Sequence, residues 1–263
     1  MKTISAVLIT HNEEHNIREA IESVLWLDEI VVVDSLSTDR TIEIAREYTT
    51  RVFQRPWPGY VEQKNFATGQ ASHDWIFSLD ADERISPLLK KEIEEWRRSN
   101  DERFKGFLIP RKSFFLGRWI THTSWYPDEK LRLYHRQYGH WAGGRVHESV
   151  LLSSPPGRFK GELLHYSYRC ISDFIRRLER YSTLAAEDHF ERGTRVTLAT
   201  LILNPFFNFV KNYFLKQGFR DGFPGLVVSI LSAVSAFFKY VKLWELQHPA
   251  GNPPAGAPQS PAP

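Results

Sequence analysis

Two aspartates separated by one residue follow an apolar segment in the sequence WIFSLDADER. The apolar residues 75–79 are typical of a buried β-strand, and alternate residues of a strand point to the same side. Asp80 and Asp82 can therefore point together beyond the strand end. Two converging carboxylates are unfavourable unless a positive charge lies between them, and a divalent cation such as Mg²⁺ or Mn²⁺ is the usual solution. The alternative is that both are turn residues before a helix that Ser86 caps and Pro87 begins.

The amino-terminal half alternates between apolar runs and segments of helical spacing. Each apolar run is short and rich in Ile and Val, and a polar loop and a predicted helix follow it. Asn12 is a candidate N-cap for the first helix. This alternation predicts a mostly parallel sheet with helices on both faces. The predicted strands are residues 4–10, 29–33, 52–53 and 75–79, and the helix before the last of them covers residues 59–70.

Polar clusters stand where three of these strands end, at residues 10–13, 34–39 and 80–82. In open α/β sheets, ligands bind outside the carboxyl ends of the strands. No G-x-G-x-x-G follows the first strand and no G-x-x-x-x-G-K-[ST] occurs in the chain, which disfavours a dinucleotide-binding enzyme and a P-loop kinase. The three clusters therefore predict one ligand site of another kind at this edge of the sheet.

The composition is that of an ordinary globular protein. The formal net charge of +3 gives no reason to expect nucleic acid as a partner. The single cysteine, Cys170, excludes an internal disulfide and a cysteine-rich zinc site. The start of the chain lacks the apolar run and cleavage site of a signal peptide, so we expect the catalytic part to lie in the cytoplasm.

Four motifs, taken in order, resemble a known family. They are TxNEE after the first strand, VVDSxSxD after the second, QKNFA in the predicted helix and SLDADE after the last strand. Together with the continuation LRLYHR, GGRVHE and HYSYR, they resemble family 2 glycosyltransferases of the lipopolysaccharide-core β-glucosyltransferase type. The resemblance extends over residues 4–245.

This resemblance implies a fold class and a division of the chain. The fold class is α/β, with a GT-A, Rossmann-like, mostly parallel central sheet and flanking helices, followed by C-terminal amphipathic helices. The expected catalytic domain is residues 1–168, in which 1–85 form the nucleotide-sugar half and 86–168 the acceptor half. A helical, membrane-associating extension (169–247) and a disordered tail (248–263) are expected to follow.

The resemblance also implies which residues hold the nucleotide. Thr10, Asn12 and Glu13 would frame the nucleobase, and Asp34 would accept a hydrogen bond from the uracil ring. Lys64 would contact the nucleotide or a phosphate, and its alternative is a solvated lysine on a helix surface.

Three further residues are expected at the phosphates. Asp80 would contact the ribose or a metal-bound water, and Asp82 would ligate a Mg²⁺ or Mn²⁺ ion that bridges the two phosphates. That ion would stabilise the negative charge that accumulates on a departing UDP. His165 is a candidate further metal ligand or phosphate contact, and the alternative is an ordinary hydrogen-bonded histidine.

The second half of the chain must supply a base, because an inverting transfer needs one carboxylate to take the proton from the acceptor hydroxyl. The resemblance favours Glu148, with His147 orienting it, and Asp128 is the alternative base. Residues 107–109, residues 131–134 and the segment around Val146 are predicted strands of this half. Since the Asp80 and Asp82 pair is assigned to nucleotide and metal, a single displacement with inversion is expected, unlike the two-carboxylate plan of retaining glycosidases.

The C-terminal third contains two apolar stretches, residues 196–215 and 223–238, beside many basic residues. The second stretch has about sixteen apolar or small residues, fewer than the roughly twenty of a membrane-spanning helix. Its serines and lysines fall in one arc at 100° per residue, which predicts an amphipathic helix. Packing on the protein is the alternative for its apolar face, but the aromatic and basic residues nearby favour a monotopic membrane anchor.

The predicted function is transfer of a hexose from a UDP-sugar to a lipid-linked glycan such as the lipopolysaccharide inner core. Glucose is the expected hexose. The expected location is the cytoplasmic face of the inner membrane, as a peripheral or monotopic protein. Transfer to polyprenyl phosphate is the nearest alternative enzyme activity. A non-catalytic membrane-bound scaffold with the same fold is the alternative from another class, and a nucleotidyltransferase is disfavoured because the loop at residues 10–14 has no Gly-rich, basic segment.

Overall fold

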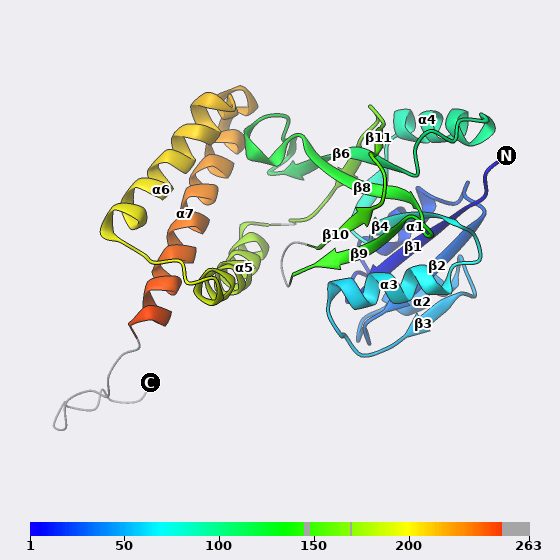
Figure 1. Cartoon of the computed structure of the whole chain (residues 1–263), viewed down its shortest axis with the longest axis horizontal. Helices are drawn as coiled ribbons and strands as arrows, with labels where there is room; N and C mark the ends of the chain where they lie inside the picture. The colour runs from blue at the N-terminus through cyan, green and yellow to red at the C-terminus, as the bar shows by residue number, and fades with distance from the viewer. Residues whose placement is uncertain (145–147, 169, 249–263) are drawn as a thin grey trace.

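A mixed β-sheet with covering helices and a group of three longer helices form the two visible parts of the protein (Figure 1). The computed structural model describes residues 1–144, 148–168 and 170–248. The strands of the main sheet lie in the order β3 (Val52–Gln54), β2 (Glu29–Asp34), β1 (Ile4–Thr10), β4 (Trp75–Asp80), β8 (Asp128–His135), β6 (Gly106–Phe115), β12 (Leu163–His165) and β5 (Glu83–Ile85). The short strands β7 (Arg118–Trp119) and β11 (Gly157–Arg158) pair with β6, while β9 (Gly139–Gly143) and β10 (Glu148–Leu152) form a separate two-stranded ribbon.

The first four strands of the chain, β1 to β4, pair in parallel, as the alternating pattern predicts. The helices of this half are α1 (Ile17–Glu22), α2 (Thr41–Arg46), α3 (Tyr60–Gln70) and α4 (Pro87–Arg98). Ser86 caps α4 by accepting a hydrogen bond from the backbone N–H of Leu89 at 3.3 Å, and Pro87 is its first residue. The predicted start of this helix is therefore confirmed.

The predicted N-cap of the first helix is wrong. Helix α1 begins at Ile17, so that Asn16 and not Asn12 stands at the N-cap position. Asn12 has a left-handed backbone, with φ of 54°, and its side chain accepts a hydrogen bond from the backbone N–H of Thr38 at 2.8 Å. Asn12 therefore joins the loop after β1 to the loop after β2, a tertiary contact that the local sequence does not reveal.

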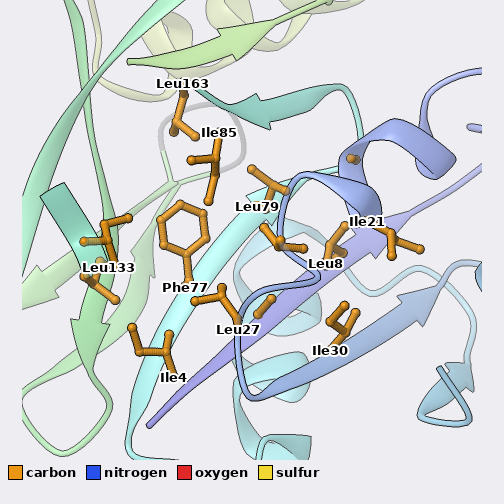
Figure 2. Packing of buried hydrophobic residues seen from close by; sticks show 14 of the residues in the cluster. Ile4, Leu8, Ile21, Leu27, Ile30, Phe77, Leu79, Ile85, Leu133 and Leu163 are labelled. Carbon is orange, nitrogen blue, oxygen red and sulfur yellow. The ribbon is translucent and has the colours of Figure 1, made fainter. Parts of the chain in front are cut away.

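Alternating residues of the parallel strands form two hydrophobic layers. On one face, Ile4 and Leu8 of β1 pack with residues of α1, α2 and α4. On the other face, Val7 packs with Ala67 of α3 and with the β9–β10 ribbon. Figure 2 shows the first layer, where the fully buried ring of Phe77 lies among aliphatic side chains of several elements. Burial of one such ring stabilises the fold by about 1.5–3 kcal/mol relative to leaving it exposed.

The second half of the sheet is antiparallel around β8, which pairs with both β4 and β6. The predicted strands at 107–109 and 131–134 are confirmed within the longer β6 and β8, whereas the segment around Val146 lies outside the described residues. Strand β12 pairs with β5 in a register that puts His165 opposite Glu83. This pairing brings residue 165 beside the turn that carries Asp80 and Asp82.

Three long helices follow the sheet: α5 (Ile171–Glu191), α6 (Leu198–Val210) and α7 (Gly222–Gln247). The short turns of the second half are η1 (Thr123–Trp125), the π-helical η2 (Lys211–Leu215) and η3 (Gly218–Asp221). Helix α7 packs against both α5 and α6 (Figure 1).

The predicted length limit of the last apolar stretch is wrong. Gly218–Gln247 makes a helical stretch of 30 residues, in which 18 consecutive residues have a mean hydropathy of 1.7, and by length and composition it can cross a membrane. The predicted apolar stretch ends at residue 238, whereas helix α7 continues past Lys242 to Gln247. The ammonium of Lys242 donates hydrogen bonds to the carbonyl of Glu179 at 2.8 Å and to the hydroxyl of Thr183 at 2.6 Å, both on α5. The basic residue is thus satisfied by protein contacts and does not end the helix.

A buried aspartate joins these helices to the sheet. Asp221, which is fully buried, accepts hydrogen bonds from the backbone N–H and hydroxyl of Thr121 at 3.1 and 2.9 Å and from the backbone N–H of His122 at 2.8 Å. Burial raises the pKa of Asp221, but the hydrogen bonds from His122 and Thr121 outweigh burial and hold it below its usual value. The start of α7 is therefore fixed to the loop after β7.

Candidate active site

A cavity of about 1030 Å³ opens at the ends of β1 and β4, where the sequence predicts a ligand site. Side chains of α3, the β9–β10 ribbon and α5 complete its wall, among them Tyr60, Trp141 and Arg177. The predicted site residues that line it are Thr10, Glu13, Lys64, Asp80, Asp82, Glu148 and His165. Segments that are more than 80 residues apart in the sequence therefore meet in one cavity.

Asp80 already has positive partners within the protein. Its carboxylate accepts a hydrogen bond from Arg132 and lies 3.0 Å from the ammonium of Lys64. Burial raises the pKa of Asp80, but Arg132 and Lys64 outweigh burial and hold it well below its usual value. From the sequence, a metal ion is expected to balance the negative charge of Asp80. In the structure, basic side chains balance most of that charge.

A second carboxylate, Glu83, completes this ion network from beneath the cavity. Glu83 is fully buried and accepts hydrogen bonds from Arg132 at 2.8 Å and from Arg111 at 3.0 Å. Burial lowers the pKa of Arg132, but Asp80 and Glu83 outweigh burial and raise it. Arg132 is among the residues that line the cavity, and its guanidinium is held by these two acids.

Lys64 lies between two of the predicted site residues. Its ammonium is 3.0 Å from Asp80 Oδ1, 3.4 Å from Glu148 Oε1 and 4.3 Å from the centre of the Trp141 ring. The side chain is only 3% exposed, so the alternative of a solvated helix lysine is excluded. Lys64 therefore links the strand end that carries Asp80 to the ribbon that carries Glu148.

Asp82 points to a different set of partners. Its Oδ2 atom lies 3.3 Å from His165 Nε2 and 3.8 Å from a guanidinium nitrogen of Arg177. Burial raises the pKa of Asp82, but His165 outweighs burial and holds it below its usual value. The imidazole of His165 contacts Ser113 through its other nitrogen at 3.1 Å, which fixes the orientation of the ring.

This arrangement fits a divalent cation in part. A carboxylate oxygen and an imidazole nitrogen are suitable ligands for Mn²⁺, and Asp82 and His165 bring one of each together. Within residues 1–144, 148–168 and 170–248, no three His, Cys, Asp or Glu side chains are grouped to hold a metal ion. A cation bound here would therefore take further oxygen ligands from a phosphate and from water, which is the usual coordination of Mg²⁺ in nucleotide sites.

The end of β1 and the loop that follows it supply two further groups. The hydroxyl of Thr10 is buried and has no hydrogen-bond partner in the described part of the chain, although the residue lines the cavity. Glu13 also lines it, and burial raises the pKa of this carboxyl group. A buried hydroxyl without a hydrogen-bond partner destabilises the protein. A ligand that forms a hydrogen bond with Thr10 would remove this penalty and bind more tightly as a result.

Two predicted residues, Asp34 and Asn12, do not line this cavity, and a third falls outside the described part of the chain. Asp34 is fully buried and accepts a hydrogen bond from the backbone N–H of Ser37 at 2.8 Å, while its neighbour Ser35 lines the wall. Asn12 lines a smaller neighbouring cavity of about 270 Å³. His147 lies outside the described residues.

Four residues of the site and its ion network were not predicted: Glu83, Arg111, Ser167 and Arg177. Glu83 lies in the SLDADE motif and Ser167 in HYSYR, whereas no motif marks Arg111 or Arg177.

Comparisons with known proteins show the family of this chain. The family model described as glycosyl transferase family 2 matches residues 5–150, more than half of the chain. The chain belongs to glycosyl transferase family 2. The family resemblance and the GT-A fold class expected from the sequence are thereby confirmed.

Relatives match nearly the whole chain. The lipopolysaccharide core biosynthesis glycosyltransferase LpsC of Rhizobium meliloti is 33% identical over 92% of this chain and 92% of its own length. An uncharacterized glycosyltransferase of Rickettsia typhi is 33% identical over 94% of this chain and 88% of its own. Among solved structures, S. aureus TarS in complex with UDP-GlcNAc has a TM-score of 0.45 and 16% identity, with 94% of this chain and 92% of that chain covered. That structural likeness is too distant to carry an argument about ligands.

The position of Lys64 gives a prediction about acid stability. Ionised Asp80, whose pKa is lowered in the fold, stabilises the protein above the pKa of an unfolded aspartate, and this stabilisation is lost as the pH falls. Lys64→Met removes one of its cations, so we expect a loss on the order of 3 kcal/mol at neutral pH. The midpoint of acid unfolding, followed by circular dichroism, should move to higher pH.

The matched control is Lys91→Met, because Lys91 is 71% exposed and pairs with Glu95 along the surface of α4. This control should leave the acid midpoint unchanged. An unchanged midpoint in Lys64→Met would contradict the role given to the buried ion network.

Proposed function

We propose that this family 2 glycosyltransferase moves a hexose from a UDP-sugar to a lipid-anchored glycan such as the lipopolysaccharide inner core, and that the hexose is glucose. The observation that carries the proposal is the meeting of two groups in one cavity. The Asp82–His165 pair lies at one end of the cavity, where it suits a nucleoside diphosphate. Glu148 lies opposite, on the β9–β10 ribbon, and forms an ion pair with Lys64. The similarity to LpsC over nearly the full length supports the choice of acceptor class.

At the donor end, the groups present suit a diphosphate. Asp82 and His165 would hold a Mg²⁺ or Mn²⁺ ion, which when bound supplies positive charge next to the departing nucleotide. The hydroxyl of Thr10, which has no hydrogen-bond partner among the described residues, can bond to the nucleoside, and Arg132 adds a fixed positive charge to the wall. These groups stabilise the negative charge that develops on the leaving UDP.

At the acceptor end, Glu148 is the proposed base. Its side chain is 19% exposed and lines the cavity, so an acceptor hydroxyl can reach it. Asp80 is engaged by Lys64 and Arg132, and Asp82 by His165, so neither is placed as a free nucleophile. One displacement with inversion at the anomeric carbon follows, in which Glu148 accepts the proton of the attacking hydroxyl.

The helical hairpin of α6 and α7 supports membrane attachment. Helix α6 has no buried residue, and Leu198, Phe207 and Phe223 are 73%, 59% and 72% exposed. In α7 the fully buried Ser229 faces the protein, while large apolar side chains face outward. This outward apolar face suits a lipid surface, and we place the protein at the cytoplasmic face of the inner membrane. Since α7 is long enough to span, transfer to polyprenyl phosphate stays the second candidate.

The donor site is tested by nucleotide binding. Full-length protein should bind UDP in a Mn²⁺-dependent manner and in preference to ADP, GDP and CMP, as measured by thermal shift and calorimetry. Asp82→Asn should lose the metal dependence and at least about tenfold in UDP affinity, because a ligand of the cation is weakened. Preference for ADP would point to another donor, and binding of no nucleotide would favour a non-catalytic scaffold.

The base is tested by separating binding from turnover. Glu148→Gln keeps the size of the side chain but cannot accept a proton, so UDP affinity should stay within about twofold of wild type while turnover falls by about 10²–10⁴-fold. Glu129→Gln, a change at another carboxylate that lines the cavity, is the control and should keep turnover. Undiminished transfer by Glu148→Gln would remove this residue as the base.

The membrane face is tested with the double variant Phe207→Asp and Phe223→Asp. Burial of each ring in lipid would contribute about 1.5–3 kcal/mol to membrane binding. Loss of both rings should therefore weaken cosedimentation with anionic phospholipid vesicles by at least about 100-fold. Leu88→Asp on α4, where the side chain is 52% exposed, is the control and should bind as wild type does. Equal vesicle binding by all three proteins would refute attachment through α6 and α7.

A further inference from the structure

Two side chains that follow the family-matched segment reach the donor end of the cavity. The family model ends at residue 150, and Ser167 and Arg177 come from the segment after β12 and from α5. Both residues line the main cavity and also the smaller cavity of about 270 Å³, so they stand where the two cavities meet. The part of the chain beyond the family match therefore contributes directly to the site.

Ser167 is a buried polar group without a partner. The residue is 6% exposed, and its hydroxyl forms no hydrogen bond with any described residue. A buried hydroxyl is normally satisfied, because leaving it without a partner costs about 1–3 kcal/mol. Its position on the wall of both cavities means that a ligand in either can supply the missing bond.

Arg177 supplies a positive charge where the two cavities meet, beside Ser167. One guanidinium nitrogen lies 3.8 Å from Asp82 Oδ2, which is longer than a hydrogen bond, and the guanidinium lies 5.4 Å from the centre of the Tyr168 ring. The neighbouring Arg176 is 76% exposed, pairs with Asp173 on the same helix, and lines the smaller cavity but not the main one. Consecutive arginines of α5 thus have different environments, and Arg177 keeps donors available at the cavity.

We propose that Ser167 and Arg177 form a phosphate-binding subsite. A planar guanidinium and a hydroxyl donor are the groups that recognise phosphate oxygens. The nearby Glu13 opposes an anion, and the charge of Arg177 offsets it. The phosphate comes either from the diphosphate of the donor or from a phosphate group on the acceptor, and the contact with Asp82 favours the donor. This choice of source rests on the proposed UDP-sugar function.

The test compares UDP with uridine, which lacks the phosphates. By calorimetry on the full chain with Mn²⁺, Arg177→Ala should bind UDP at least about tenfold more weakly and uridine as wild type does. Ser167→Ala should show a smaller loss of the same kind, and Arg177→Lys, which keeps the charge, should retain part of the affinity. Arg192→Ala is the matched control and should bind UDP normally, because Arg192 is 70% exposed, pairs with Asp188 at the end of α5 and lines neither cavity. Melting temperatures show whether each variant folds.

A second arm separates the two sources of phosphate. If Arg177→Ala keeps UDP affinity but UDP-saturated wild type binds inorganic phosphate and the variant does not, the subsite serves the acceptor. If wild type binds no UDP, the donor proposal fails, and inorganic phosphate alone then tests the subsite with the same variants. The inference would be overturned if wild type, Arg177→Ala and Ser167→Ala had the same affinity as one another for UDP, and likewise for inorganic phosphate.

Discussion

The buried ammonium of Lys64, placed between Asp80 and Glu148, is the interaction on which the cavity depends. Charges taken out of water are stable only when they are paired and hydrogen-bonded, and loss of one partner leaves the others uncompensated. The ring of Trp141 below the ammonium and the pair of Arg132 and Asp80 beside it complete this balance. Because α3, β4 and the β9–β10 ribbon each supply a member, the ion network fixes three elements relative to one another at the point where chemistry is proposed.

This network also separates the two aspartates of the D-x-D motif. Asp80 is bound to basic side chains within the protein, whereas Asp82 faces His165 and the cavity. The separation follows from the chain turning between β4 and β5, after which β5 pairs with β12 and brings His165 alongside. One carboxylate thus organises the protein, and the other is available to a ligand. Similar residues in one short motif acquire different tasks because their surroundings differ.

The helices after the sheet connect the site with the outward apolar face. Helix α5 places Arg177 at the cavity and packs against α7 through Lys242. At the other end of α7, the buried Asp221 holds the helix to Thr121 and His122. The apolar face is therefore attached to the catalytic part at both ends, and a lipid surface covering α6 and α7 would lie at a set position relative to the cavity. An acceptor anchored in lipid requires such a set position.

The strands β1 to β4, the cap of α4 and the family could be predicted from the sequence, because Ile/Val runs, helical spacing and capping residues act over a few neighbouring positions. The family resemblance, and not local pattern, predicted Thr10, Lys64, Asp82, Glu148 and His165 for one site. Local reasoning failed for Asn12, whose partner Thr38 is far along the chain, and for the end of α7, where Lys242 bonds to α5. The partners of Asp80 and the approach of Arg177 to Asp82 join strands and helices that are distant in sequence. Only the tertiary structure decided these contacts, since side-chain pairing across elements depends on register and packing that no local pattern encodes.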